Sequence, residues 1–90
     1  MASNLLLGRI AIVTGAASGL GRATALAFAK QGAAVVCADQ KASQSHQPAT
    51  HQLIINMGGR GIFAETDVSD SGSMEALVRK AVKEYGRLDM

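Results

Sequence analysis

The sequence predicts an α/β fold whose strands form a doubly wound parallel sheet. Short, continuously apolar runs alternate along the chain with segments of helical periodicity, in the order β-α-β-α-β-α-β. Such runs are typical of strands that helices cover on both faces, because neither side of the strand meets water. A chain of 90 residues has room for one small domain. We therefore expect residues 1–90 to form one partial domain, cut inside its fourth strand.

Three complete strands and the beginning of a fourth are expected. Ile10–Val13 is continuously apolar, and Ala34–Ala38 is a second apolar run that Asp39 closes. Gly61–Glu65 is the third candidate, and Leu88–Met90 has the composition of the first residues of a fourth. Parallel strands of one sheet are joined by right-handed crossovers. The segments between these runs should therefore be helices that lie on the faces of the sheet.

The first two helices follow the first two strands. The alanine-rich segment Leu20–Gln31 is expected to be helical and to end before Gly32, where a left-handed residue commonly closes a helix. A short second helix is expected from Pro48, whose missing N–H suits a first turn, to Met57. One face of the first helix is predicted to be apolar and to consist of Leu20, Ala23 and Ala27, with Leu26 and Phe28 beside them.

The third helix has the clearest amphipathic pattern in the chain. Ser69 or Ser71 is expected to cap its start, and Gly86 is expected to stop it. Its apolar residues recur at i, i+3, i+4, i+7, i+8 and i+11, which places them on one side: Met74, Leu77, Val78, Ala81, Val82 and Tyr85.

Three glycines lie in the stretch TGAASGLGRA, directly after the first strand. A strand that turns sharply into a helix brings free N–H groups and the positive end of the helix dipole to one point, where a phosphate can bind. Gly15, Gly19 and Gly21 suit a tight turn, a close approach of the backbone to a pyrophosphate, and close packing of helix on strand. Their spacing in this context predicts a dinucleotide site. The alternative is a plain turn followed by a close-packed helix.

An acidic residue, Asp39, ends the second strand, 18 residues beyond Gly21. A carboxylate at about this distance accepts hydrogen bonds from the hydroxyls of the adenosine ribose. Its negative charge would repel a 2′-phosphate, and neither Ser18 nor Gln40 offers a positive charge. The sequence therefore predicts NAD as the cofactor, with NADP less favoured. The alternative for Asp39 is a helix-capping or solvated aspartate.

The stretch TGAASGLG resembles the Thr-Gly-x-x-x-Gly-x-Gly cofactor motif of the short-chain dehydrogenases/reductases. The chain is similar to the first half of that family also in TDVSD after the third strand and YGRLD before the fourth. The resemblance implies a Rossmann-like sheet that binds NAD(P), and hydride transfer between NAD and an alcohol or carbonyl compound. It implies that Asp67 hydrogen bonds to the adenine amino group and that Val68 borders the ring through its backbone. As a sequence feature, Asp67 is equally a turn residue. The residues that would line the pyrophosphate and the nearby ribose are Gly15, Ser18, Gly19, Leu20 and Gly21.

The catalytic residues of that family do not occur in this sequence. The family uses a serine and a Tyr-x-x-x-Lys pair, whereas the single tyrosine here, Tyr85, has Asp89 at the position of the lysine. We therefore expect no catalytic residue and no turnover from this chain alone, and a small-molecule substrate only in a full-length parent. The alternatives are a non-enzymatic nucleotide-binding remnant and a truncated gene product without a function of its own. Oligomer interfaces in this family are set by later segments.

Composition argues against several other classes of function. The net charge is +2 and the basic residues are scattered, which does not favour a nucleic-acid partner. Cys37 is the single cysteine and lies in an apolar run, and His46 and His51 are not aligned on a helix face, so we expect no metal site. No apolar run approaches the ~18 residues of a membrane span, and a cytoplasmic chain is expected. One basic group is interpreted as a solvated helix face: Arg79, Lys80, Lys83 and Arg87.

Overall fold

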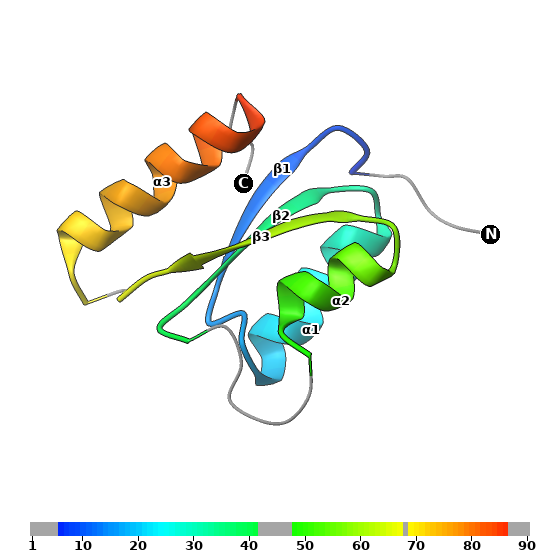
Figure 1. Ribbon diagram of the computed structural model, residues 1–90, viewed down its shortest axis with the longest axis horizontal. Coiled ribbons are helices and arrows are strands. Elements are labelled where there is room, and N and C mark those ends of the chain that lie inside the picture. Colours follow the sequence, from blue (N-terminus) through cyan, green and yellow to red (C-terminus); the bar gives the residue numbers. More distant parts are fainter. Residues whose placement is uncertain (1–5, 42–47, 68, 87–90) are drawn as a thin grey trace.

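The computed structural model describes residues 6–41, 48–67 and 69–86. Strands and helices alternate along it (Figure 1), and this order confirms the predicted α/β fold as far as the third helix. The fourth strand expected at 88–90 lies outside the described residues. The elements are β1 (Ile10–Thr14), α1 (Gly19–Lys30), β2 (Ala34–Asp39), α2 (Thr50–Asn56), β3 (Arg60–Glu65) and α3 (Ser71–Tyr85).

The three strands form one parallel sheet in the order β1-β2-β3. At the carboxyl ends of the strands, Thr14 of β1 pairs with Ala38 of β2, and Asp39 of β2 pairs with Glu65 of β3. Because the strands run in the same direction, the loops that follow them all leave the sheet at this one end. The glycine stretch after β1, the acidic end of β2 and the turn after β3 are therefore neighbours in space.

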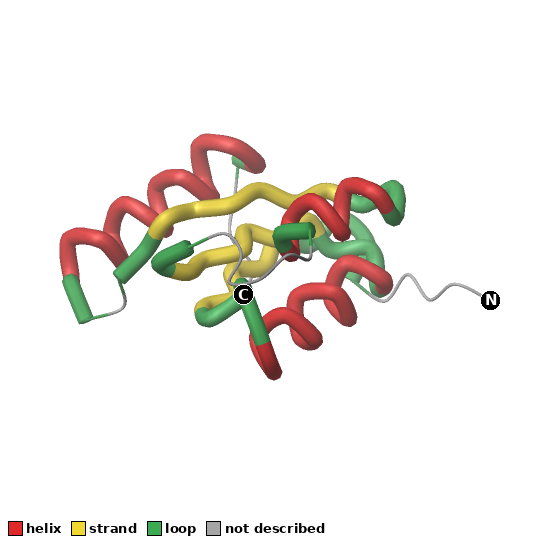
Figure 2. Tube along the Cα trace, turned by 60° about the horizontal axis from the view of Figure 1, so that its bottom comes forward, coloured by secondary structure: helices red, strands yellow, loops and turns green. Residues whose placement is uncertain are grey.

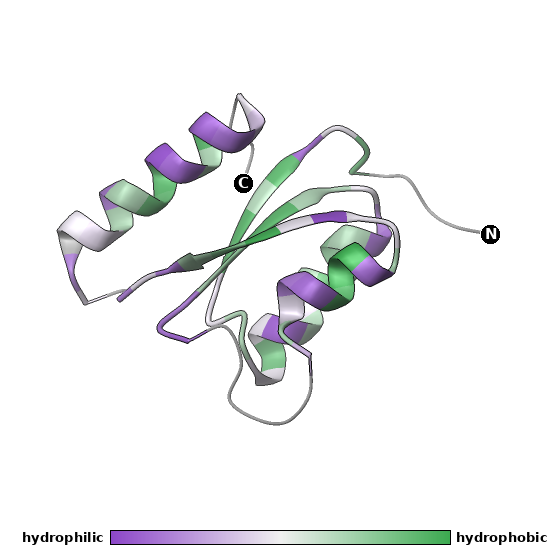
Figure 3. Cartoon of the chain, viewed as in Figure 1, coloured by the Kyte–Doolittle hydropathy of each residue, from purple (hydrophilic) through white to green (hydrophobic). Residues whose placement is uncertain are grey.

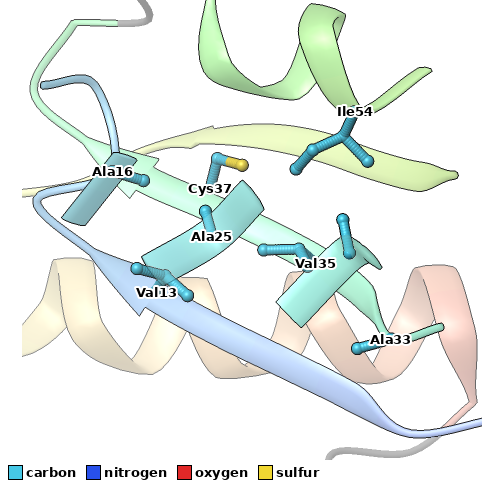
Figure 4. Packing of buried hydrophobic residues seen from close by; sticks show 8 residues of the cluster. Val13, Ala16, Ala25, Ala33, Val35, Cys37 and Ile54 are labelled. Atoms are coloured by element: carbon cyan, nitrogen blue, oxygen red, sulfur yellow. The ribbon is translucent and has the colours of Figure 1, made fainter. Parts of the chain in front are cut away.

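Helices cover both faces of the sheet, as a doubly wound fold requires. Helices α1 and α2 pack on one face and α3 on the other (Figures 1 and 2). The side chains of β2 alternate between the two layers, with Val35 and Cys37 under α1 and α2, and Val36 and Ala38 under α3. This alternation explains why the β2 sequence is apolar at every position. Figure 4 shows the first layer, in which Ile54 of α2 lies over the β2 side chains.

The apolar face predicted for α1 is wrong. Alanines at every second position leave the hydrophobic period ambiguous, so the rotation of the helix is set by how closely it can approach the sheet. Gly21, Ala25 and Ala29, at i, i+4 and i+8, give the smallest face; both alanines are buried, and Gly21 lies against the end of β1. Leu26 and Phe28 do pack beside the core, as expected. The three residues predicted for the buried face are exposed instead: Leu20, Ala23 and Ala27.

The stripe of α3 is covered along only one of its sides. Leu77 and Ala81 are buried, and Met74 and Tyr85 pack partly against them. Val78 and Val82, which belong to the same predicted stripe, are each 43% exposed. Apolar and polar residues alternate along this helix (Figure 3).

Two helix starts differ from the sequence prediction, whereas the predicted helix stop is confirmed. Helix α3 is capped by Asp70, whose carboxylate accepts a hydrogen bond from the Gly72 N–H, and not by either neighbouring serine. Helix α2 begins at Thr50 and not at Pro48, because the chain at Ala49 is extended. Gly86 ends α3 in the left-handed conformation, as predicted. None of the described helices is long and apolar enough to cross a bilayer.

Candidate cofactor-binding site

The glycine stretch forms the turn between β1 and α1. Gly15 and Gly19 have φ angles of +66° and +58°, a region that residues other than glycine adopt only with strain. Apart from its chain neighbours and the backbone of α1 itself, no heavy atom of the described residues lies within 4 Å of the point where a Cβ of Gly19 would stand. The backbone at Gly19 therefore borders open space at the start of α1.

Gly21 has a different role, because it brings helix and strand into contact. A Cβ at this position would overlap the carbonyl oxygen of Gly15 and lie 3.1 Å from that of Thr14. Only a hydrogen atom fits between the first turn of α1 and the end of β1. Together the three glycines fit the turn, the open approach and the close packing that a dinucleotide loop requires.

The N-terminus of α1 is open to an external acceptor. Ser18 is its N-cap residue, yet within the described part of the chain its hydroxyl caps no backbone N–H. The first hydrogen bond of the helix runs from the Arg22 N–H to the Ser18 carbonyl, at 3.3 Å. The amides of Gly19, Leu20 and Gly21 precede that bond and so lack a partner inside the helix. With no acidic residue in the first turn, this end of the helix is suited to an anion.

The middle of the loop is held firmly by the rest of the fold. The Ala16 N–H donates to the Ala38 carbonyl at 3.1 Å, and the Ala17 N–H donates to Oδ2 of Asp39 at 3.0 Å. The Ala16 carbonyl accepts a hydrogen bond of 2.5 Å from the Thr50 hydroxyl of α2. Three hydrogen bonds from two other elements thus fix two consecutive residues. Nothing in the sequence pattern singles out Thr50, because the pattern predicts a helix start at Pro48, two residues before the observed one.

Asp39 is neither a helix cap nor a fully solvated aspartate. It is partly buried at the end of β2, where Oδ2 accepts from Ala17 and Oδ1 accepts from the Gln40 N–H at 2.7 Å. These two bonds orient the carboxylate toward the glycine loop. Each carboxylate oxygen can accept a second hydrogen bond, so the group retains the capacity to bind hydroxyls of a ligand.

Asp67 lies in the turn between β3 and α3. Its Oδ1 accepts from the Ser69 N–H at 3.0 Å and from the Ser69 hydroxyl at 2.6 Å, and its own N–H donates to the Ser73 hydroxyl. The hydrogen bonds from Ser69 lower the pKa of the Asp67 carboxyl below its ordinary value. The structure thus places Asp67 in a turn at the same end of the sheet as Asp39. Val68 lies outside the described residues.

Three further side chains that could carry chemistry are Cys37, Tyr85 and His51. Cys37 is buried as predicted, and burial raises the pKa of its thiol to about 11, so it stays protonated at neutral pH. Tyr85 is half-buried beside Arg60, the first residue of β3, and therefore lies at the opposite end of the sheet from the glycine loop. His51 belongs to α2 and packs against Phe63, with ring centroids 5.9 Å apart.

The described residues hold no cluster of metal ligands, and the basic residues of α3 make different contacts. No three His, Cys, Asp or Glu side chains of residues 6–41, 48–67 and 69–86 are grouped to hold a metal ion. On α3, Arg79 is exposed and pairs with Glu75 at 3.6 Å. Lys80 reaches back to the sheet, and its ammonium group donates to the Phe63 carbonyl at 2.8 Å. His46 and Arg87, which the sequence also singled out, lie outside the described residues.

Comparison with known proteins identifies the family. The family model described as short chain dehydrogenase matches residues 9–90. This chain belongs to the short chain dehydrogenase family. Members of this family use a nicotinamide dinucleotide, NAD or NADP, as their cofactor. The glycine loop at the open start of α1 is therefore part of a dinucleotide-binding fold.

Individual short chain dehydrogenases match almost all of this chain. A short chain dehydrogenase/reductase of Aspergillus oryzae is 45% identical over 85 residues, which cover 94% of this chain and 32% of the relative. The cis-4-hydroxycyclohexanecarboxylate dehydrogenase of Sinomonas cyclohexanicum is 42% identical over 82 residues, 91% of this chain and 32% of the relative. A crystal structure of a hydroxysteroid dehydrogenase from Escherichia coli superposes with a TM-score of 0.85 at 34% identity, covering 96% of this chain and 36% of that one. The chain thus spans about one third of the length of the short chain dehydrogenases that it matches.

Proposed function

We propose that this chain binds the adenosine and pyrophosphate part of NAD, within an oxidoreductase that transfers hydride between NAD and an alcohol or carbonyl compound. The observation that carries the proposal is the open N-terminus of α1, reached through a glycine turn that Asp39 and α2 hold in place. Bound NAD supplies the carbon that accepts or donates the hydride. The chain's own residues bind and orient the other half of the cofactor.

The pyrophosphate is assigned to the backbone at the start of α1. The amides of Gly19, Leu20 and Gly21 provide donors in one direction, and the helix dipole adds a partial positive charge. The Ser18 hydroxyl, which makes no capping bond among the described residues, is a further donor at the same place. The positive φ of Gly15 makes the turn that directs the chain into this position.

Asp39 is assigned to the hydroxyls of the adenosine ribose. Its carboxylate is already oriented by Ala17 and Gln40, so it binds the ribose without losing further side-chain freedom. A 2′-phosphate at that position would meet the negative charge of Asp39 directly. This supports NAD over NADP. Asp67 and Val68 are assigned to the adenine, with Asp67 accepting from its amino group and Val68 contributing its backbone.

The groups that transfer the proton in the reaction are assigned to a part of the full-length protein outside residues 1–90. The sequence has a single tyrosine, Tyr85, which packs at the far end of the sheet beside Arg60. We therefore expect no steady production of NADH by this chain with simple alcohols. Measurable turnover above a protein-free blank would contradict this expectation, whereas NAD binding without turnover agrees with it.

Residues outside this chain, in the remaining two thirds of a family member, determine the substrate. Similar stretches occur in a dehydrogenase named for a cyclohexane carboxylate and in one named for hydroxysteroids, which are unlike in size and charge. The proposal therefore extends to the class of alcohol or carbonyl compound and to no particular member. We expect the parent protein to act in the cytoplasm on small molecules, without a nucleic-acid or membrane partner.

Exchange of one charge tests the assignment of Asp39. We expect the wild-type chain to bind NAD more tightly than NADP. Asp39→Asn keeps the shape of the side chain and one acceptor oxygen, and it should reduce the ratio of the NADP to the NAD dissociation constant about tenfold. Two unit charges about 4 Å apart repel by ~1–4 kcal/mol near a protein surface. The dissociation constants of both nucleotides, measured by calorimetry, give the ratio directly.

Asp70→Asn is the matched control, because Asp70 caps α3 and lies outside the proposed site. It should leave the ratio of NAD to NADP affinity unchanged. Equal wild-type affinity for the two nucleotides, or the same change in both variants, would contradict the assignment.

A further inference from the structure

Thr50 is a buried polar residue with an unusual partner. It is the first residue of α2 and is 1% exposed. A threonine near a helix start commonly bonds within its own first turn. Here the hydroxyl instead donates to the carbonyl oxygen of Ala16, 34 residues earlier in the chain, at 2.5 Å. The helix itself starts after Ala49, which has no polar side chain to cap it.

The acceptor of this bond lies at the centre of the glycine loop. Ala16 is fully buried, and its N–H is bonded to Ala38 at the end of β2. The Thr50 bond therefore fixes the second polar group of the same residue, from a different element. Ala17, the next residue, donates to Asp39. The chain leaves this pair through Ser18 directly into the amides at the start of α1.

A second contact joins the same two regions from the opposite direction. The Arg22 guanidinium of α1 donates from Nη2 to the Pro48 carbonyl at 3.0 Å. This bond is exposed, whereas the Thr50 bond is buried. The two contacts bracket the start of α2 between the glycine loop and the first turn of α1. The start of α2 is thereby coupled to the geometry of the loop.

We propose that Thr50 is a positioning residue for the pyrophosphate site. Its hydroxyl holds the Ala16–Ala17 peptide group in the orientation that points the Gly19–Gly21 amides outward. The proposal rests on the function proposed above, since it assigns Thr50 to the same site. It predicts that removal of the hydroxyl weakens binding of the pyrophosphate and not of the adenosine.

Two variants and two ligands test this. Thr50→Val keeps the shape of the side chain and removes the donor, while Thr50→Ser keeps the donor and removes a methyl group. We expect Thr50→Val to bind ADP-ribose about tenfold more weakly, the change expected when one buried hydrogen bond is lost. Its affinity for adenosine should stay within about twofold of wild type, and Thr50→Ser should bind ADP-ribose within about threefold. Equal losses for both ligands, or for both variants, would overturn the proposal.

Native-state hydrogen exchange decides the role of Thr50 without any ligand. In Thr50→Val the Ala16 and Ala17 amides should exchange at least about tenfold faster, because their loop opens locally, while the Val36 amide in the central strand keeps its rate. Unchanged exchange at both loop amides would overturn the proposal. If the wild-type chain binds neither ADP-ribose nor NAD, the proposed function fails, and the exchange rates still show whether Thr50 holds the loop.

Discussion

Helices α1 and α3 begin at the same end of the sheet, but the N–H groups of their first turns are bonded differently. At α3 the Asp70 carboxylate accepts from the Gly72 N–H at 2.9 Å, so the chain itself supplies the first acceptor. At α1 the N-cap is Ser18, a residue able to do the same, and in the described structure its side chain bonds to none of the first amides. Both helices follow a parallel strand and both lack acidic residues in the first turn.

The N-cap of α1 does not lack a bond because the loop before it is poorly held. The loop before it donates hydrogen bonds to Ala38 and Asp39 and accepts one from Thr50. The turn before α3 is held mainly by its own residues, Asp67, Ser69 and Ser73. A well-held helix start without a protein acceptor forgoes about 1 kcal/mol of capping stabilisation. That cost at a rigid position is typical of a ligand site, while the self-contained turn at α3 is typical of a structural cap.

Adding one methyl group at each helix start should give opposite results. In Gly21→Ala the new Cβ overlaps the Gly15 carbonyl, so the free energy of unfolding should fall by about 3 kcal/mol and NAD binding should be lost. In Gly72→Ala the new Cβ lies 3.4 Å from Asp70 Oδ1, an ordinary contact. That variant should gain about 0.5–1 kcal/mol from better helix propensity. Urea unfolding followed by circular dichroism measures both.

Similar behaviour of the two glycine variants would contradict this difference between the helix starts. A stable Gly21→Ala chain that still binds NAD would show that close packing of α1 on β1 is not needed for the site. A strongly destabilised Gly72→Ala chain would show that the α3 start is as tightly constrained as the α1 start.

Removing the two N-cap side chains separates stability from binding. Asp70→Ala should lower the free energy of unfolding by about 1 kcal/mol and leave the NAD dissociation constant unchanged. Ser18→Ala should change stability by less than ~0.5 kcal/mol, since no capping bond is lost. It should weaken NAD binding about fivefold, the equivalent of one hydrogen bond of about 1 kcal/mol. Calorimetric binding and thermal unfolding on the same samples test the pair, and a stability loss in Ser18→Ala would assign Ser18 to the fold alone.

The order of elements was predictable because short apolar runs alternate with helical segments that glycines close, and both are local features of the sequence. The glycine spacing and Asp39 were singled out for the same reason, since turn chemistry and the end of a strand are local features. The buried face of α1 was not predictable from period alone. With alanines at 23, 25, 27 and 29, it was the steric limit at Gly21, a contact with another strand, that chose Ala25 and Ala29 over the other pair.

Contacts between distant segments account for what the sequence pattern missed. Asp70 caps α3, whereas the hydroxyl of Ser69, one of the two serines predicted for the cap, donates to Asp67. Thr50 donates to a residue 34 positions away, which no local period reports. The stripe on α3 was correctly found, but its coverage depends on the surroundings of Val78 and Val82, which remain exposed here.

The smallest expected effect concerns the carboxyl of Asp67. Two hydrogen bonds from Ser69 lower its pKa below the ordinary value of 3.8, so they stabilise the fold above pH 3.8, and that contribution is lost as the pH falls through the lowered pKa. In Ser69→Ala the pKa should rise toward 3.8, whereas Ser73→Ala, which removes a bond to the Asp67 N–H only, should leave it in place. Carbon-detected NMR titration of the side chain distinguishes them. Equal pKa values in all three proteins would mean that the turn before α3 is not closed on itself, and the contrast with α1 would then rest on Asp70 alone.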